Sequence, residues 1–241
     1  AKSIDTAILY HDDVYIPAGT YRCSSQIALR ANIKLTGAGM GITYLRKDHT
    51  TYGGVLLANS NSETVQLANI TVRDFTLTDD VVGLGFSEQQ HLITFHGVDN
   101  LLVDRIGCYG FRGDGLYIGE YNGGINTRLN TNITITNCVF DGVNKNNRQC
   151  ISVITGEYIT ITNNVFRNST RADMPGAVDF EPDASITSVI TNVTVKGNKF
   201  FNIGGNVGAV CCAIPATVAK FHNVVIAGNT FDTCSRAMTI I

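Results

Sequence analysis

The sequence predicts an all-β protein folded as a right-handed, single-stranded parallel β-helix, a solenoid of roughly seven to eight coils. The main observation is a short phrase of alternating branched aliphatic and polar residues, usually opened by asparagine. The phrase begins at Asn69, Asn100, Asn132, Tyr158, Asn192 and Asn223. Its spacing of 26 to 34 residues is typical of a solenoid, in which equivalent units stack on one another. The 24 glycines and the lack of helical periodicity after the first residues also favour this fold.

Each phrase is expected to form a strand with one buried face, because its apolar residues lie two apart, as Ile133 and Ile135 do. A large apolar residue follows at a fixed offset, and these residues predict an internal column of stacked rings: Phe140, Phe166, Phe200 and Phe231. One bend position is equivalent in four coils and predicts a ladder of side-chain hydrogen bonds: Cys138, Asn164, Asn198 and Asn229.

A second short strand is expected between successive phrases. These strands begin near residues 92, 115, 150, 177, 210 and 237. Two to three short strands per turn fit a parallel β-helix better than a sandwich, whose turns would not return the same side chain to the same place. Without a linker or a low-complexity stretch, residues 1–241 are expected to form a single domain.

Composition restricts the partners and cofactors. A net charge of −2 and a pI near 6.2 argue against nucleic acid and anionic lipid, and no apolar run reaches membrane length. These residues show no signal-peptide pattern, which predicts either export by another route or a segment that was removed. The seven cysteines form no CxxC pair and are expected to pack as small hydrophobic side chains rather than as disulfides. No cofactor is predicted, and no metal, because a calcium site would need three or more acids on adjacent coils.

The first coils resemble a known superfamily. The stretch VYIPAGTY from Val14, followed by IALRANIKLTGAGMGITYL, is similar to the opening of pectate-lyase-like β-helices, which include bacteriophage tailspikes and polysaccharide depolymerases. The resemblance implies an amphipathic N-terminal capping helix, but the run from Asp5 to Val14 is short and predicts a shortened cap. The apolar end at Ile241 predicts a fragment or domain of a longer protein. The tailspike resemblance also implies a homotrimer in an extracellular virion.

One strand carries the predicted catalytic acids. If Val178 and Phe180 point inward, Asp179 and Glu181 point outward and face solvent on one sheet. Two such carboxyl groups can span either the short separation of a retaining glycosidase or the longer one of an inverting glycosidase. Asp114, at the corner before its own strand, is the third predicted catalytic residue.

The same alignment predicts a polar binding stripe below these acids. Ser152 is expected one coil below Asp179, Tyr117 two coils below, and Thr94 or His96 three coils below. The inserted segment RNSTRADMPG at residues 167–176 is expected to form one wall of a groove over this face. The predicted substrate-binding residues are Tyr117, Arg148, Ser152, Arg171 and His96.

Three segments that begin at Gly113, Asn147 and Pro175 resemble consecutive coils of carbohydrate-active β-helix proteins. The resemblance implies hydrolysis of a bacterial surface polysaccharide, either capsule or lipopolysaccharide. Two alternatives stay open. One is a non-catalytic receptor-binding or structural spike. The other is a polysaccharide lyase or uronate epimerase, since DFEPD is similar to a strand motif of alginate epimerases, with Glu181 in place of Asp and Asp183 in place of His.

Overall fold

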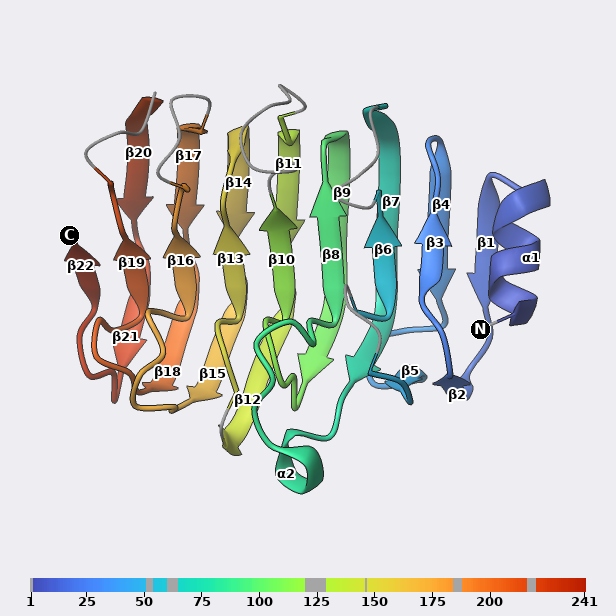
Figure 1. The fold of residues 1–241 in the computed structure, drawn as a ribbon, viewed down its shortest axis with the longest axis horizontal. Helices are drawn as coiled ribbons and strands as arrows, with labels where there is room; N and C mark the ends of the chain where they lie inside the picture. Colours follow the sequence, from blue (N-terminus) through green and yellow to red (C-terminus); the bar gives the residue numbers. More distant parts are fainter. Residues whose placement is uncertain are drawn as a thin grey trace.

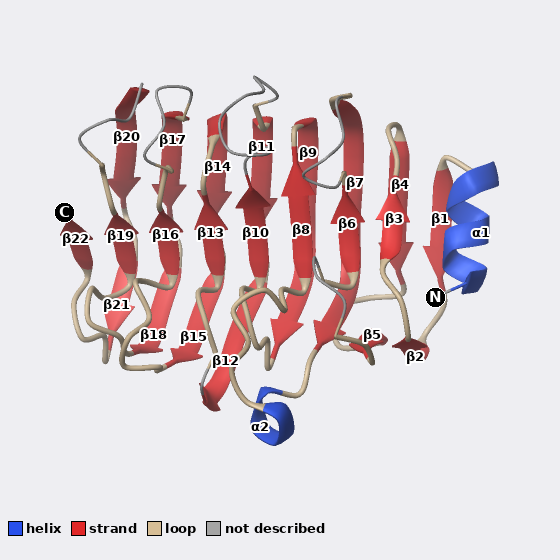
Figure 2. Ribbon diagram, in the orientation of Figure 1, coloured by secondary structure: helices blue, strands red, loops and turns tan. Residues whose placement is uncertain are grey.

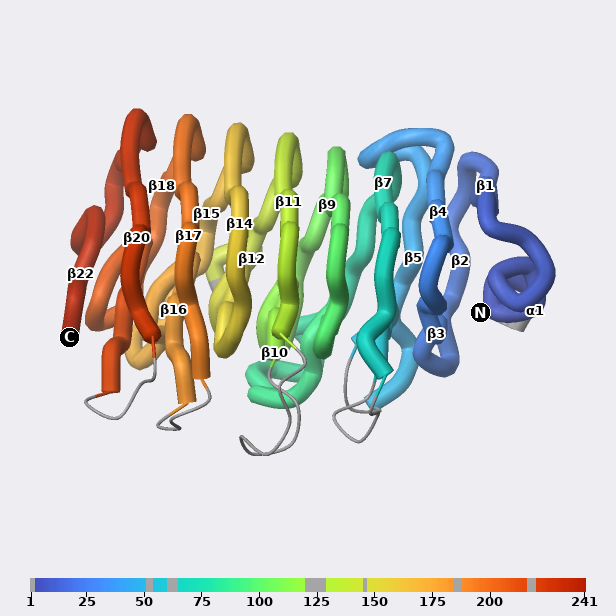
Figure 3. The backbone as a smooth tube through the Cα atoms, turned by 90° about the horizontal axis from the view of Figure 1, so that it is seen from above, coloured from blue at the N-terminus to red at the C-terminus, as the bar shows by residue number. Residues whose placement is uncertain are grey.

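The computed structural model describes residues 2–50, 54–59, 65–119, 129–145, 147–183, 188–215 and 220–241. In these residues the chain coils around one axis as a right-handed parallel β-helix (Figure 1). Viewed from above, successive coils lie side by side between the helix α1 at one end and the strand β22 at the other (Figure 3). The predicted fold class is confirmed.

Two parallel sheets form the wall of the solenoid. The larger has fourteen strands: β1 (Asp13–Ile16), β2 (Gly19–Cys23), β4 (Ile33–Gly37), β5 (Thr43–Lys47), β7 (Leu67–Thr78), β9 (Val98–Tyr109), β11 (Thr131–Thr136), β12 (Val139–Lys145), β14 (Gly156–Thr162), β15 (Val165–Ser169), β17 (Val189–Lys196), β18 (Lys199–Ile203), β20 (Lys220–Ala227) and β21 (Thr230–Asp232). The smaller has eight: β3 (Ile27–Leu29), β6 (Leu56–Ala58), β8 (Ile93–His96), β10 (Leu116–Gly119), β13 (Ile151–Val153), β16 (Val178–Phe180), β19 (Val210–Cys212) and β22 (Met238–Ile240). The eight parallel strands of the smaller sheet agree with the predicted number of coils.

The repeated phrase forms the strands β7, β9, β11, β14, β17 and β20 of the larger sheet. Its equivalent positions pair in register, so that Ile133 lies beside Ile159 and Ile159 beside Val193. The first residue of every phrase has a positive φ, between 55° and 58°. Asparagine tolerates this left-handed conformation better than other residues with a side chain, which explains why it usually opens the phrase.

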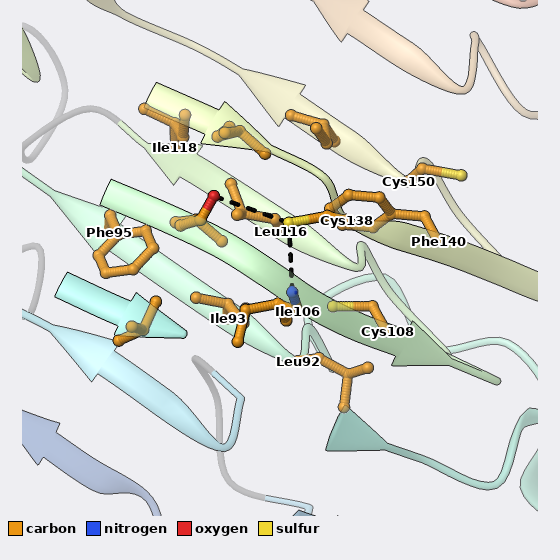
Figure 4. Close-up of a cluster of buried hydrophobic side chains, with 14 of the residues drawn as sticks. Leu92, Ile93, Phe95, Ile106, Cys108, Leu116, Ile118, Cys138, Phe140 and Cys150 are labelled. Carbon is orange, nitrogen blue, oxygen red and sulfur yellow. Dashed lines mark hydrogen bonds between the residues drawn. The ribbon is translucent and has the colours of Figure 1, made fainter. Parts of the chain in front are cut away.

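The inward side chains fill the space between the sheets (Figure 4). Phe140, Phe166, Phe200 and Phe231 form the predicted column, with successive ring centroids 5.3, 4.8 and 5.0 Å apart. All seven cysteines are free thiols and six are buried, which confirms that they pack as small hydrophobic side chains.

The predicted asparagine ladder is also present. The backbone N–H of Asn164 donates to Oδ1 of Asn198 at 2.9 Å, and the N–H of Asn198 donates to Oδ1 of Asn229 at 2.9 Å. The N–H of Cys138 donates to Oδ1 of Asn164 at 2.8 Å, so the cysteine ends the ladder. Each asparagine therefore satisfies buried backbone groups of the neighbouring coil.

We expect Asn198→Ala to lower the free energy of unfolding by about 2 kcal/mol, because it leaves buried backbone groups without partners. The groups that lose their bonds are the N–H of Asn164 and the carbonyl of Ile161, which accepts from Nδ2 of Asn198 at 2.9 Å. Urea unfolding measures the effect. Lys196→Ala, at an exposed position of β17, is the control and should change stability by less than about 0.5 kcal/mol. Equal losses in the two variants would contradict the role of the ladder.

Two helices complete the described fold (Figure 2). The nine-residue α1 (Lys2–Tyr10) covers the first coil with Ile4 and Ile8 and is the predicted short cap. The second helix, α2 (Val81–Leu84), was not predicted, and the expectation of no helix after the first residues is wrong at this point. Its single turn is set by a local cap, in which the Asp80 side chain accepts a hydrogen bond from the N–H of Gly83 at 2.9 Å. Neither helix is long and apolar enough to span a membrane.

Candidate active site

The outward row of the smaller sheet has the predicted register. Tyr117 lies beside Ser152, and Ser152 lies beside Asp179, on adjacent strands. On the other side Tyr117 pairs with Thr94, whereas His96 pairs with Gly119. The register therefore assigns Thr94, and not His96, to the position three coils below Asp179.

The exposure of this row differs from the prediction. Asp179, Ser152 and Thr94 are fully buried and His96 is 1% exposed, so the expectation that Asp179 and the stripe face solvent is wrong. Side chains from the corners of the coils lie over the row. Nε2 of Gln149 donates to Oδ2 of Asp179 at 3.0 Å. The His91 ring stacks on Tyr117 with a centroid distance of 4.7 Å and an interplanar angle of 6°, and it leaves Tyr117 half-buried.

His91 and Gln149, which were not predicted as site residues, form a column with Asp114. Each lies two residues before its strand in the smaller sheet, and the strands pair in register. The N–H of Asp114 donates to Nδ1 of His91 at 3.0 Å, and the N–H of Gln149 donates to Oδ1 of Asp114 at 3.2 Å. Aligning the residue two places before each strand would have revealed this polar column.

His91 is neutral in this arrangement. Burial, followed by the positive charge of Arg148, lowers its pKa to about 3. Nδ1 also lies 3.3 Å from Oδ2 of Asp114, a distance that would suit an ion pair. Nδ1 already accepts a hydrogen bond from the Asp114 N–H, so we assign the imidazole as neutral. Its contact with the Asp114 carboxyl group is therefore not an ion pair.

Arg148 joins the acids of the site. Its Nη1 lies 2.9 Å from Oδ2 of Asp114, and its Nη2 lies 3.6 Å from Oε2 of Glu181 and 3.5 Å from Oε1 of Glu88. Asp114 and Arg148 thus meet at neighbouring corners of adjacent coils. Glu181 follows β16 directly and its side chain is 40% exposed, so it is the predicted catalytic acid that reaches solvent.

Two of the acids hold protons near neutral pH. Burial raises the pKa of Asp114 to about 7, against the opposing effect of Arg148. Burial and then the negative charge of Glu181 raise the pKa of Asp179 to about 7. Oδ1 of Asp179 is buried without a hydrogen-bond partner among the described residues. A carboxyl group in such surroundings exchanges protons in the pH range where many enzymes work.

The glycines beside Asp114 are required for close approach of the coils. A Cβ on Gly113 would lie 2.6 Å from the carbonyl oxygen of Glu88. A Cβ on Gly115 would lie 2.8 Å from the carbonyl oxygen of Cys150 and from the Phe140 ring. The Gly-Asp-Gly motif therefore lets neighbouring coils pack tightly around the Asp114 carboxyl group.

A cleft of about 240 Å³ lies beside Arg148. It is lined by Phe86, Glu88, Arg148, Arg171, Asp173, Met174 and Pro175. The inserted segment forms one wall, as predicted, and its Arg171 guanidinium carbon lies 3.3 Å from the centroid of the Phe86 ring. Arg167 is not part of this wall, because it pairs with Asp141 at 2.7 Å on the larger sheet.

A larger hollow, of about 560 Å³, lies near α2 and reaches the buried Lys47. Nζ of Lys47 donates to Oε1 of Gln90 at 2.9 Å and to the carbonyl oxygen of His91 at 3.1 Å, and lies 3.7 Å from Oδ2 of Asp79. Burial lowers the pKa of Lys47 to about 8. These contacts make Lys47 a support for the backbone at His91. Across the described ranges, no three His, Cys, Asp or Glu side chains are grouped so that they would hold a metal ion.

Comparisons with known proteins agree with this architecture. The family model described as rhamnogalacturonase A/epimerase, pectate lyase-like, matches residues 2–240. The structure of the pre-mature bacteriophage phi29 gene product 12 is similar, with a TM-score of 0.73 and 20% identity over 96% of this chain and 30% of that chain. The catalytic unit of a GH87 alpha-1,3-glucanase from Streptomyces thermodiastaticus strain HF3-3 has a TM-score of 0.54 and 17% identity, over 97% of this chain and 44% of that chain.

At these identities the structural similarity shows the fold alone, and the chain spans less than half of either protein. No curated protein matches the sequence. The family model, in contrast, covers nearly every residue, including all strands of both sheets. The chain therefore belongs to the rhamnogalacturonase A/epimerase, pectate-lyase-like family.

Proposed function

We propose that this protein hydrolyses glycosidic bonds of a bacterial surface polysaccharide at the acid cluster around Arg148. The observation that carries the proposal is the pairing of Asp179, whose pKa is raised to about 7, with the solvent-exposed Glu181 two residues later. Glycoside hydrolysis requires a carboxyl group that keeps a proton near neutral pH beside a second, ionised one. The family description and the glucanase activity named for the GH87 structure support a carbohydrate substrate.

The burial of each acid assigns its role in this proposal. Glu181 is the catalytic residue, because its carboxyl group reaches solvent beside the cleft. Asp179 is fully buried and acts through Glu181, whose negative charge helps to raise the pKa of Asp179, and we assign one proton to the pair. Asp114 is a positioning residue, since it holds Arg148 at 2.9 Å and Arg148 in turn faces Glu181.

We assign the cleft and the half-buried Tyr117 of β10 as the surface that binds the sugar chain. Arg171 and Phe86 line the cleft and offer a guanidinium group and an aromatic ring, which bind sugar hydroxyl groups and sugar faces respectively. Ser152 and His96 lie behind this surface, and the His96 ring meets the Tyr117 ring edge-on at 5.9 Å. We assign these two residues to the support of Tyr117 and Asp179. The homotrimer and the virion location stay predictions.

One observation favours a second function, a rod that binds glycan without cleaving it. Asp114 and Asp179 are fully buried and are hydrogen-bonded to Arg148 and Gln149, respectively, an arrangement that also fixes the corners of the coils.

An assay on a panel of bacterial capsular polysaccharides and lipopolysaccharides separates the two functions. New reducing ends support the hydrolase. New ultraviolet absorbance from unsaturated uronic ends would contradict the hydrolase and support a lyase. Binding without any product would contradict the hydrolase and support the glycan-binding rod.

A further inference from the structure

The hollow of about 560 Å³ near α2 lies outside the acid cluster and takes no part in the proposed hydrolysis. It is formed by the ends of β5 and β7 and by the segments that follow these strands. Eight of its nine lining side chains are polar or charged, and Leu84 is the exception. The hollow is large enough for a small molecule, and its lining suits a ligand that is rich in hydrogen-bonding groups.

Two of the lining side chains are buried and have hydrogen-bonding capacity that the protein leaves unused. The side chains of Lys47 and Asp79 are 1% and 5% exposed, and Nζ lies 3.7 Å from Oδ2, which is too far for a hydrogen bond. Nζ gives two of its three hydrogens to Oε1 of Gln90 and to the carbonyl oxygen of His91. Oδ2 of Asp79 has no hydrogen-bond partner within the described ranges. Because a buried carboxyl oxygen without a partner is costly, a donor from a ligand would be stabilised at this point.

We infer that this hollow binds a neutral sugar unit of the polysaccharide, with one sugar hydroxyl group between Lys47 and Asp79. A hydroxyl oxygen can accept a hydrogen bond from Nζ and donate its own hydrogen to Oδ2, and the 3.7 Å gap separates one such donor from one such acceptor. The hydroxyl groups of Thr50 and Thr78 line the hollow and can bond to the other hydroxyl groups of the sugar. The inference rests on the polysaccharide ligand of the proposed function but not on its cleavage.

The charges of the lining favour a neutral ligand. Arg46 and Lys47 lie among three aspartates, so the hollow has no field of one sign that would select an anion or a cation. One aspartate is already paired, since Oδ2 of Asp48 accepts a hydrogen bond from Nε of Arg22 at 3.1 Å. Burial lowers the pKa of Lys47 to about 8 and raises the pKa of Asp79, which brings both groups closer to their uncharged forms. A neutral sugar therefore fits this site better than a uronic acid or an amino sugar.

One segment of the chain separates this hollow from the cleft at Arg148. Asp80 and Leu84 line the hollow, whereas Phe86 and Glu88 line the cleft. The segment includes α2, which projects from the coils (Figure 1). Leu84 and Phe86 are exposed on this segment and offer apolar surface on which the faces of sugar rings can pack. The two sites thus lie on either side of one segment, as the binding of a single long sugar chain requires.

An NMR titration of the ¹⁵N-labelled protein with single sugars tests the inference. The neutral probes are glucose, galactose, mannose, rhamnose and N-acetylglucosamine, and the charged probes are glucuronate and glucosamine. We expect at least one neutral sugar to shift the backbone amide signals of Lys47, Asp79 and Asp80 with a Kd in the millimolar range. The charged sugars should bind about 10-fold more weakly or not at all.

A matched pair of variants locates the site. Thr78→Trp places a large ring in the hollow from the end of β7 and should weaken binding of the neutral sugar by about 10-fold or more. Thr160→Trp is the control, because Thr160 is also half-buried and lies on β14 between Thr134 and Thr194, and it should leave the Kd unchanged. Tryptophan is well accepted in β-strands, so both variants should keep the wild-type melting temperature within a few degrees.

The outcomes separate this inference from the proposed hydrolase. Amide shifts at Asp79 and Asp80 that are lost in Thr78→Trp and kept in Thr160→Trp support the sugar site. The inference is overturned if no neutral sugar shifts these signals, if the two variants bind equally well, or if a charged sugar binds more tightly than every neutral one. A wild type that cleaves no glycan of the panel would contradict the hydrolase and leave this site standing, whereas loss of this site would leave the hydrolase standing.

Discussion

Replacing Glu181 by glutamine is expected to lower kcat on the cleaved polysaccharide by about 100- to 10,000-fold, because the amide cannot donate and recover the proton of the leaving group. Glutamine keeps the size of the side chain and a carbonyl oxygen for Arg148, which lies 3.6 Å from the Glu181 carboxylate. The loss should therefore appear in kcat and not in KM. Counting reducing ends at several substrate concentrations separates the two constants.

The position of Glu181 makes this variant informative. Its side chain is 40% exposed, so the substitution leaves no buried charge and the melting temperature should stay within a few degrees of the wild type. The control for loss of one negative charge is Glu157→Gln on β14, whose carboxylate accepts a hydrogen bond from Thr191 at 3.1 Å. A Glu181→Gln variant that cleaves at the wild-type rate would remove the acid from the mechanism and favour the glycan-binding rod.

Replacing Arg148 by methionine is expected to lower the free energy of unfolding by about 3 to 5 kcal/mol, because it leaves the fully buried Asp114 without its counter-ion. The Arg148 side chain is only 15% exposed and also faces the two glutamates. Loss of Arg148 raises the pKa of Asp114 further, and a raised carboxyl pKa in the folded state means that stability falls as the pH rises. The destabilisation should be larger near pH 8 than near pH 5.

Chemical unfolding of matched variants tests this expectation. Arg22→Met removes an arginine whose side chain is 72% exposed and pairs with Asp48, and it should cost no more than about 1 kcal/mol. Adding Asp114→Asn to Arg148→Met should restore part of the lost stability, since the unpaired buried carboxylate is then absent. Equal losses of unfolding free energy in the two arginine variants would contradict the role of Arg148 as the counter-ion of Asp114.

The repeat made most of the fold predictable. A side chain such as Phe166 returns to one place in every coil, because parallel strands pair in register and the bend after each phrase has a constant length. The ladder through Asn198 follows from the same regularity. The helix α2 escaped prediction because its single turn depends on the Asp80 cap, which leaves no periodic pattern.

The candidate site was predictable only in part. Asp114, Arg148 and Glu181 were all predicted site residues, and the structure places the three in contact through the guanidinium group. The burial of Asp179 was not predictable from alternation along its strand, since it depends on Gln149 reaching over the row from a corner. Glu88 escaped attention because it stands in a turn outside the repeat, and only closure of the next coil brings it to Arg148.

The most direct test of the central claim, that the Asp179 and Glu181 pair holds the catalytic proton, is the pH dependence of kcat/KM. The pKa of Asp179 is raised to about 7, so the proton is present below that pH and lost above it. We predict that kcat/KM falls on the alkaline side with an apparent pKa near 7, and that Asp179→Asn, which removes the neighbouring charge, moves this fall to lower pH. A kcat/KM that stays constant between about pH 5 and 8, or a fall that is identical in Asp179→Asn, would contradict the account.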